Sequence, residues 1–88
     1  MTLGEAGQIY VTLAAAQRYA ELRRLRPEEA RRELTSLLLD AKCTREATAT
    51  SPAHYRARSR ATQLDVSATV AREDRLLVVL SCSAREYR

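Results

Sequence analysis

The sequence predicts a single α+β domain, with two helices packed on one face of a mostly antiparallel four-stranded sheet, in the order β-α-α-β-β-β. Three observations support this class. A segment rich in β-branched and aromatic residues precedes two helical patterns, and three strand-like segments follow them. The length of 88 residues leaves room for one domain. A composition of 45% apolar and 30% charged residues is typical of a globular chain.

The first half of the chain is predicted to hold one strand and two helices. Residues 8–13 read QIYVTL and favour a strand, so residues 1–7 are expected to form a flexible N-terminus. Good helix formers follow, and Tyr19 lies on their apolar stripe. Tyr10 and Tyr19 are therefore both expected in the core. Pro27 suits the first turn of a second helix. Its apolar residues recur at helical spacing, namely Ala30, Leu34, Leu37, Leu38 and Ala41.

The second half is predicted to be a loop followed by an antiparallel meander of three strands. Residues 44–52 lack apolar periodicity and form the expected loop. Residues 53–61 and 63–70 alternate between two faces, and residues 76–82 are apolar on both faces, which is typical of a central strand. Residues 8–88 thus form one domain. Either the first or the last strand is expected at a sheet edge, which invites pairing with a second copy, giving a homodimer, or with a strand of a partner.

Alternation within residues 53–61 puts a row of basic side chains on one face of a single strand. Arg56, Arg58 and Arg60 follow one another about 6.6–7 Å apart, and His54 precedes them. Guanidinium groups in such a row suit phosphates or an acidic protein surface. The alternative is a solvated face whose arginines pair with nearby acidic residues, namely Asp65, Glu73 and Asp74.

The C-terminal residues and the overall charge extend this basic character. Arg85 and Tyr87 share one parity at the end of the last strand, where they either join the arginine row or belong to a frayed terminus. The chain has 15 basic and 11 acidic residues, a net charge of +4, and Lys42 is its single lysine. This mild excess is compatible with nucleic acid, with an acidic protein partner or with solubility alone.

The sequence offers little for conventional catalysis or metal binding. His54 is the sole histidine and Cys43 and Cys82 are the only cysteines, so a zinc site lacks ligands and neither a metal nor another cofactor is expected. The two cysteines are expected to be small buried residues in a reducing compartment, and a disulfide between them is the alternative. The longest apolar run, residues 76–80, is too short to span a membrane, and residues 1–7 do not resemble a secretory signal. We therefore expect a cytoplasmic protein without a membrane partner.

Several segments together are similar to one known family. The β-α-α-β-β-β order, YAELRRL, EEARRELTSLLLDAK, YRARSR and VVLSCSAREYR resemble the RelE/ParE superfamily of toxin–antitoxin toxins over roughly residues 8–88. The resemblance implies an antitoxin partner. One branch of the family cleaves mRNA, which would assign phosphate binding and charge stabilisation to Arg56, Arg58 and Arg85 and proton transfer to Tyr87. The other branch binds and blocks a protein target.

We consider three hypotheses for the function. A further alternative is a folding module whose role lies within a larger assembly. The first is stoichiometric inhibition of a protein or nucleoprotein, as by a ParE-like toxin or a phage-encoded inhibitor such as an anti-CRISPR protein. Its binding residues are His54, Arg56, Arg58, Arg60 and Arg85. The second is a metal-independent mRNA endoribonuclease that uses Arg58, Arg85 and Tyr87. The near absence of lysine departs from the nuclease pattern and favours the first hypothesis. The third is a generic nucleic-acid-binding module, with RNA as a candidate ligand.

Overall fold

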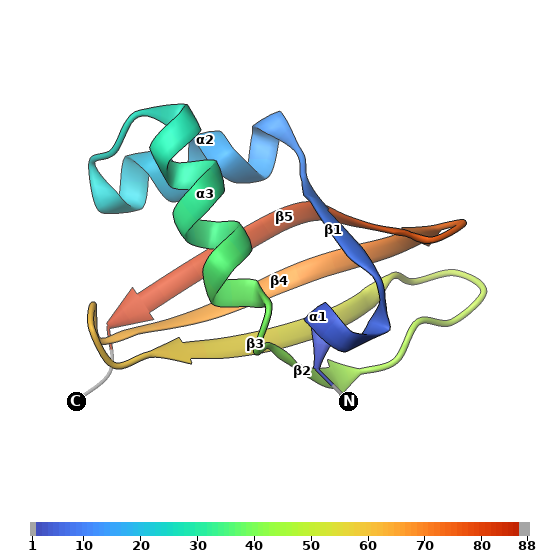
Figure 1. The fold of residues 1–88 in the computed structure, drawn as a ribbon. Coiled ribbons are helices and arrows are strands. Elements are labelled where there is room, and N and C mark those ends of the chain that lie inside the picture. The colour runs from blue at the N-terminus through green and yellow to red at the C-terminus, as the bar shows by residue number, and fades with distance from the viewer. Residues whose placement is uncertain (1, 87–88) are drawn as a thin grey trace.

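The computed structural model describes residues 2–86, which form a five-stranded sheet and three helices (Figure 1). The helices are α1 (Leu3–Ala6), α2 (Leu13–Arg23) and α3 (Pro27–Leu38). The strands are β1 (Gln8–Val11), β2 (Lys42–Arg45), β3 (Ala53–Ser59), β4 (Leu64–Glu73) and β5 (Leu76–Glu86). None of the helices within residues 2–86 is long and apolar enough to cross a membrane.

The sheet has the strand order β1-β5-β4-β3-β2. Strands β2 to β5 pair antiparallel, whereas β1 runs parallel to β5 with Gln8 opposite Leu76. The prediction of a four-stranded, mostly antiparallel sheet with two helices is therefore wrong. The fifth strand is β2, which includes the start of the segment expected to be a loop, residues 44–52. The sequence predicts that either the first or the last strand lies at a sheet edge. The first strand, β1, does lie at an edge, whereas the last strand, β5, lies inside the sheet.

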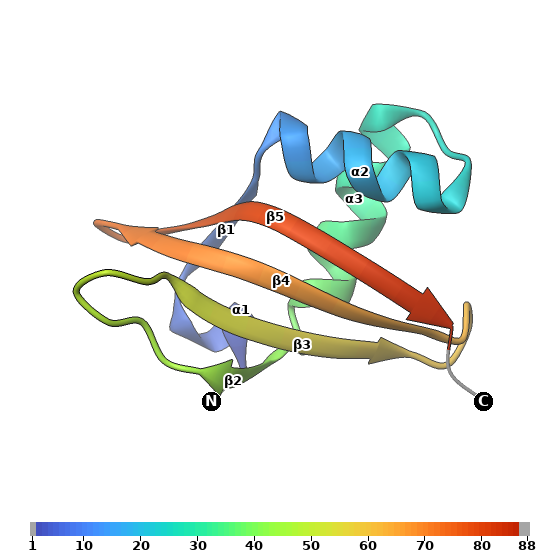
Figure 2. The same ribbon diagram turned by 180° about the vertical axis from the view of Figure 1, so that it is seen from behind.

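Helices α2 and α3 cover one face of this sheet, and the opposite face of β3, β4 and β5 carries no helix (Figures 1 and 2). The apolar first half of β5 explains its central position, because Leu77 is 3% exposed and Val79 is fully buried between β1 and β4. Tyr19 and Leu34 are fully buried beneath the helices. Tyr10 is 47% exposed, so the prediction of a core tyrosine is confirmed for Tyr19 and wrong for Tyr10.

Residues 3–6 form the short helix α1, within the segment 1–7 that the sequence predicts to be a flexible N-terminus. Leu3, in α1, is fully buried, and its N–H donates to the carbonyl oxygen of Ala41 at 2.8 Å. The Gly4 N–H donates to the carbonyl oxygen of Leu39 at 3.0 Å, and Thr2 pairs with β2. The N-terminal segment is therefore attached to the end of α3 and to the edge of the sheet.

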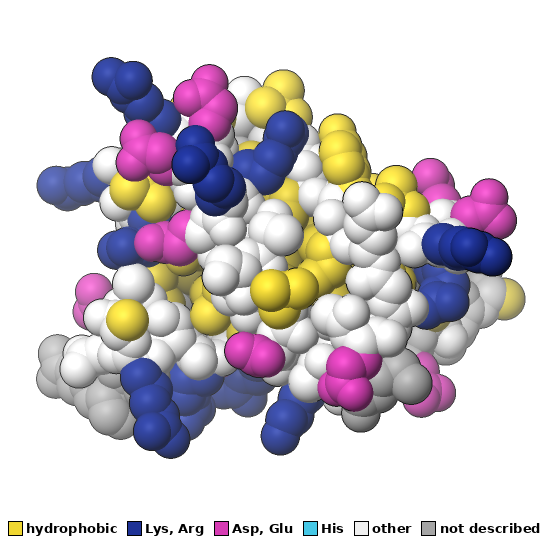
Figure 3. All heavy atoms as spheres, in the orientation of Figure 1, with side chains coloured by type: hydrophobic (Ala, Val, Ile, Leu, Met, Phe, Trp, Pro, Cys, Tyr) yellow, Lys and Arg dark blue, Asp and Glu magenta, His cyan; other side chains and the backbone are white. Residues whose placement is uncertain are grey.

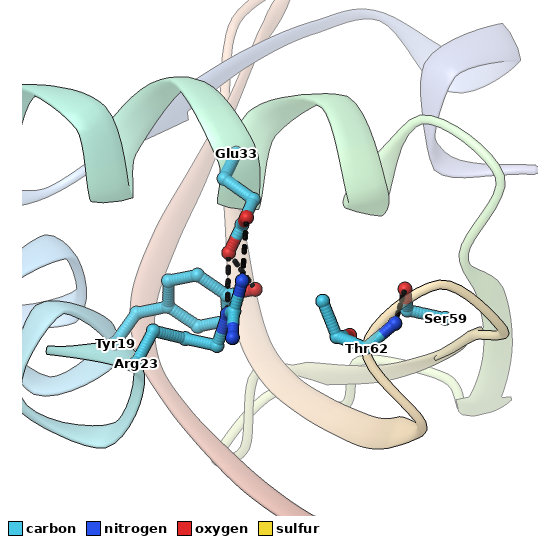
Figure 4. A network of polar contacts seen from close by, with 5 residues as sticks. All are labelled: Tyr19, Arg23, Glu33, Ser59 and Thr62. Atoms are coloured by element: carbon cyan, nitrogen blue, oxygen red, sulfur yellow. Dashed lines mark hydrogen bonds and ion pairs between the residues drawn. The ribbon is translucent and has the colours of Figure 1, made fainter. Parts of the chain in front are cut away.

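A carboxylate of α3 holds the two long helices together (Figure 4). The Glu33 carboxylate accepts hydrogen bonds from the Tyr19 hydroxyl at 2.6 Å and from the Arg23 Nε at 2.9 Å and Nη2 at 3.1 Å. The bonds from Arg23 lower the pKa of Glu33, while burial and the neighbouring Glu33 raise the pKa of Tyr19. Both groups thus keep the charge states that the network needs near neutral pH.

Candidate anion-binding face

Strand alternation divides the side chains of the sheet between a helix-covered face and an open face. Ala57, Val66 and Ala68 are buried under the helices. Cys82 belongs to the same face, because its Sγ donates to the carbonyl oxygen of Ala15 in α2 at 3.4 Å. The alternate residues of β3, β4 and β5 point away from the helices, and we call their surface the open face. Cys43 on β2 is exposed, so the expected burial holds for Cys82 only.

Strand register arranges the polar residues of the open face in three cross-strand rows. The first row is Arg58, Asp65 and Arg85. The second row is Lys42, Arg56, Ser67 and Ser83. The third row is Arg45, His54, Thr69 and Ser81. In these rows, within residues 2–86, Asp65 is the only carboxylate.

Asp65 organises the arginines around it. Its side chain is 4% exposed, and a carboxylate in such a place needs charged partners that donate hydrogen bonds to it. The Arg56 guanidinium donates two hydrogen bonds to it, from Nε to Oδ1 at 2.7 Å and from Nη2 to Oδ2. The Arg58 Nη2 lies 3.8 Å from Oδ2. The Arg56 hydrogen bonds, assisted by the charges of Arg58 and Arg85, hold the pKa of Asp65 below its usual range.

A shallow depression lies beside this cluster, and we call it the hydroxyl notch. Its lining includes two guanidinium groups, Arg56 and Arg85, three hydroxyl side chains, Ser67, Ser83 and Thr44, and the Asp65 carboxylate. Ser67 and Ser83 are direct cross-strand neighbours, and Arg56 lies opposite Ser67 from the other side. Within residues 2–86, the hydroxyls of Ser67 and Ser83 make no hydrogen bond to another residue. The Thr44 hydroxyl donates to the carbonyl oxygen of His54 at 3.3 Å, so the hydroxyl donors that the notch presents to a ligand are those of Ser67 and Ser83.

The charge of the open face differs from that of the helix side. Over the helices, basic and acidic side chains are interspersed around a hydrophobic centre (Figure 3). The first two rows of the open face hold four cations and one carboxylate. The carboxylate is Asp65, and the cations are Lys42, Arg56, Arg58 and Arg85. Because one carboxylate neutralises only part of this charge, the open face carries an excess of positive potential.

The structure brings together most of the residues that the sequence singled out. Arg56, Arg58 and His54 share the open face of β3, and Arg85 lies beside them on β5. Arg60 lies outside the strand, in the turn that follows β3. Tyr87 lies outside the described residues.

The alternative hypothesis, in which the arginines pair with nearby acidic residues, holds for one of the three acidic residues named. Asp65 pairs with Arg56 and Arg58. Glu73 and Asp74 lie at the opposite end of β4, next to the turn that leads into β5. The arginine row is therefore a partly neutralised cluster, and it is not a line of isolated cations.

Sequence reasoning missed the parts of the site that come from other strands. Ser67 has the same outward parity as Asp65 on β4, so alternation could have placed it on the arginine face. Ser83 and Thr44 could not be placed in this way, because their positions depend on the pairing of β5 with β4 and of β2 with β3. Within residues 2–86, no group of three or more His, Cys, Asp or Glu side chains could hold a metal ion.

A second depression lies between α3 and the turn that joins β3 to β4 (Figure 4). Its polar groups are largely committed to the fold. Glu33 accepts three hydrogen bonds from α2, and the Ser59 hydroxyl accepts one from the Thr62 N–H at 3.3 Å. The Thr62 hydroxyl oxygen is buried without a partner in the described part of the chain. This single oxygen defines no ligand.

Comparison of the chain with models of protein families, with curated proteins and with solved structures found no match in any of the three.

Proposed function

We propose that this chain is a non-catalytic binding protein that docks its open face on an anionic partner, an acidic protein surface or a nucleoprotein, and blocks it stoichiometrically. The observation that carries the proposal is the gathering of Arg56, Arg58 and Arg85 around one carboxylate, Asp65. Guanidinium groups form bidentate contacts with carboxylates and phosphates, and the face of β3, β4 and β5 without a helix leaves room for a large partner. Binding of this kind requires no catalytic group.

The proposal keeps the biological setting expected from the sequence. Such an inhibitor would be a toxin of the ParE kind, with an antitoxin as its partner, or an inhibitor encoded by a phage. A cytoplasmic location belongs to the proposal, and the two free cysteines suit a reducing compartment. Homodimer formation by strand pairing also belongs to it, because β1 is an edge strand without a charged residue.

The test is capture of the partner from host lysate, with and without nuclease treatment, by two charge-matched variants. Arg58→Ala/Arg85→Ala removes two cations from the open face, and Arg26→Ala/Arg32→Ala removes two exposed cations from the helix side. Arg56 is left in place because its loss would leave the buried Asp65 without its main partner. We expect the first variant to lose the captured partner and the second to retain it. Equal capture by both variants would contradict the proposal.

A metal-independent mRNA endoribonuclease is the second candidate function. The observation that favours it is the position of Arg58 and Arg85 on the two sides of Asp65 in one cross-strand row. This reaction assigns proton transfer to Tyr87, so Tyr87→Phe should remove most RNA cleavage while RNA binding survives. Absence of cleavage by the unmodified protein would exclude the enzyme, and full cleavage by the variant would exclude the role of Tyr87.

A further inference from the structure

We propose that the open face binds the sugar–phosphate backbone of a nucleic acid, with one phosphate seated in the hydroxyl notch between Arg56 and Arg85. This inference rests on the proposed function and specifies the chemistry of the partner.

The donor set of the notch matches a phosphate group. Phosphate oxygens in protein–nucleic acid complexes are bound mainly by Arg and Lys together with Ser and Thr hydroxyls. Here Ser67 and Ser83 lie opposite each other on β4 and β5, Arg56 lies opposite Ser67, and Arg85 belongs to the next row. Asp65 is 4% exposed and is turned toward Arg56 and Arg58, so its negative charge is partly compensated before a ligand arrives.

Further cations surround the notch, which favours a polymer of phosphates over a single phosphate group. Arg58 occupies the neighbouring row and Arg60 the turn beyond it, while Lys42 and Arg45 lie on the adjoining edge strand β2. Rows of one face follow each other about 6.6–7 Å apart, and neighbouring strands lie about 4.8 Å apart. A ligand with regularly repeated charges can contact several of these groups at once.

The three rows lack the groups that stabilise most protein–protein interfaces. Such interfaces depend on a few buried aromatic or large apolar anchors, and within residues 2–86 these rows contain no Trp, Tyr, Phe, Leu, Ile or Met. Protein–nucleic acid interfaces are more polar and much more positively charged. The absence of Tyr, Phe and Trp from these rows also removes the usual platform for base stacking. We therefore expect recognition of the backbone, independent of base sequence.

The experiment measures fluorescence anisotropy of labelled RNA and DNA duplexes and single strands of several sequences at increasing KCl. We expect binding at low salt, with the logarithm of the binding constant falling linearly with the logarithm of the salt concentration. Arg85→Ala should weaken binding to all sequences alike and reduce the steepness of this dependence by about one unit. Ser67→Ala/Ser83→Ala should weaken binding at least about fivefold without changing the steepness, because the charge is unchanged. Arg26→Ala/Arg32→Ala should leave both quantities unchanged.

Several results would overturn the inference. One is that no oligonucleotide binds at low salt. Another is that the Arg85 and serine variants bind as strongly as the unmodified protein. A third is that polyglutamate displaces the duplex as readily as unlabelled duplex does. Failure of the inference is distinguishable from failure of the proposed function. A protein that is captured after nuclease treatment and lost with Arg58→Ala/Arg85→Ala would sustain the proposed function while overturning the nucleic-acid partner.

Discussion

The geometry of the open face depends on the Asp65 carboxylate more than on any other residue. This side chain is 4% exposed, and a carboxylate in such a place is stable only when it is paired and hydrogen-bonded. Arg56 donates two hydrogen bonds to it, and Arg58 approaches within 3.8 Å. Guanidinium groups held in this way lose less conformational freedom on binding than free side chains do. Asp65 therefore preorganises the arginines of the proposed binding face.

The first prediction concerns the pH dependence of stability. Arg56 lowers the pKa of Asp65 and Arg23 lowers that of Glu33, so each carboxylate is a stronger acid in the folded chain. Their contribution to the free energy of unfolding is complete above the ordinary carboxyl pKa range and is lost as the pH falls through the lowered values. Thermal unfolding followed between about pH 7 and pH 2 should show this decline. Asp65→Asn should be less stable near neutral pH, and its decline in acid should be shallower. Parallel curves for the variant and the unmodified protein would contradict the pairing.

The second prediction concerns the hydroxyl of Tyr19, which is fully buried and donates to Glu33 at 2.6 Å. Tyr19→Phe keeps the ring and removes this hydrogen bond to a charged carboxylate, at a cost of about 1.5–3 kcal/mol. For a domain of this size, each kcal/mol corresponds to a decrease of about 4–8 °C in the melting temperature. The matched control is Tyr10→Phe on the exposed ring of β1, which should leave the melting temperature nearly unchanged. Equal effects of the two substitutions would show that the bond to Glu33 contributes nothing.

At the scale of elements, the segments with a clear periodicity were predictable. Helix α3 begins at Pro27 as its proline and acidic first turn predict, and its buried residues include Ala30, Leu34 and Leu38. Alternation predicted β3 and most of β4, and the run of apolar residues predicted a central β5. In each of these elements, the positions that become buried require apolar residues, so their spacing can be read in the sequence.

The remaining elements depend on contacts between distant segments. All four residues of β2 are exposed and show no alternation, and this strand forms because β3 on one side and Thr2 on the other bind its backbone. The parallel pairing of β1 with β5 joins residues almost 70 positions apart, such as Gln8 and Leu76. No local pattern specifies such a neighbour. The same holds for the hydroxyl notch, because Ser83 reaches Ser67 only through the register of β5.

The third prediction tests the attachment of α1. A Cβ atom at Gly4 would lie 2.9 Å from the backbone oxygen of Leu39, which is too close for an ordinary contact. Gly4→Ala should therefore shift α1 away from the end of α3 and lower the free energy of unfolding by about 1–3 kcal/mol. Chemical denaturation measures this change, with Gln17→Ala on the exposed side of α2 as the control. Unaltered stability of the Gly4 variant would show that α1 is not held as described.

For the whole molecule, the two faces of the sheet divide the apolar core from the proposed binding surface. The helix-covered face holds the apolar core, and the three cross-strand rows of the open face carry polar and basic side chains from β2, β3, β4 and β5. Substitutions on the open face should therefore change binding with little effect on the core. Arg56 and Asp65 are exceptions, because they stabilise each other.

The central claim is that the open face, and no other surface, contacts the anionic partner. The most direct test is a ¹H–¹⁵N spectrum of the arginine Nε–H groups, recorded while a nucleic-acid duplex or the captured partner is added. The account predicts that the signals of Arg58 and Arg85 shift in proportion to the bound fraction, while those of Arg26 and Arg32 stay in place. Shifts confined to Arg26, Arg32 or other arginines of the helix side would contradict it.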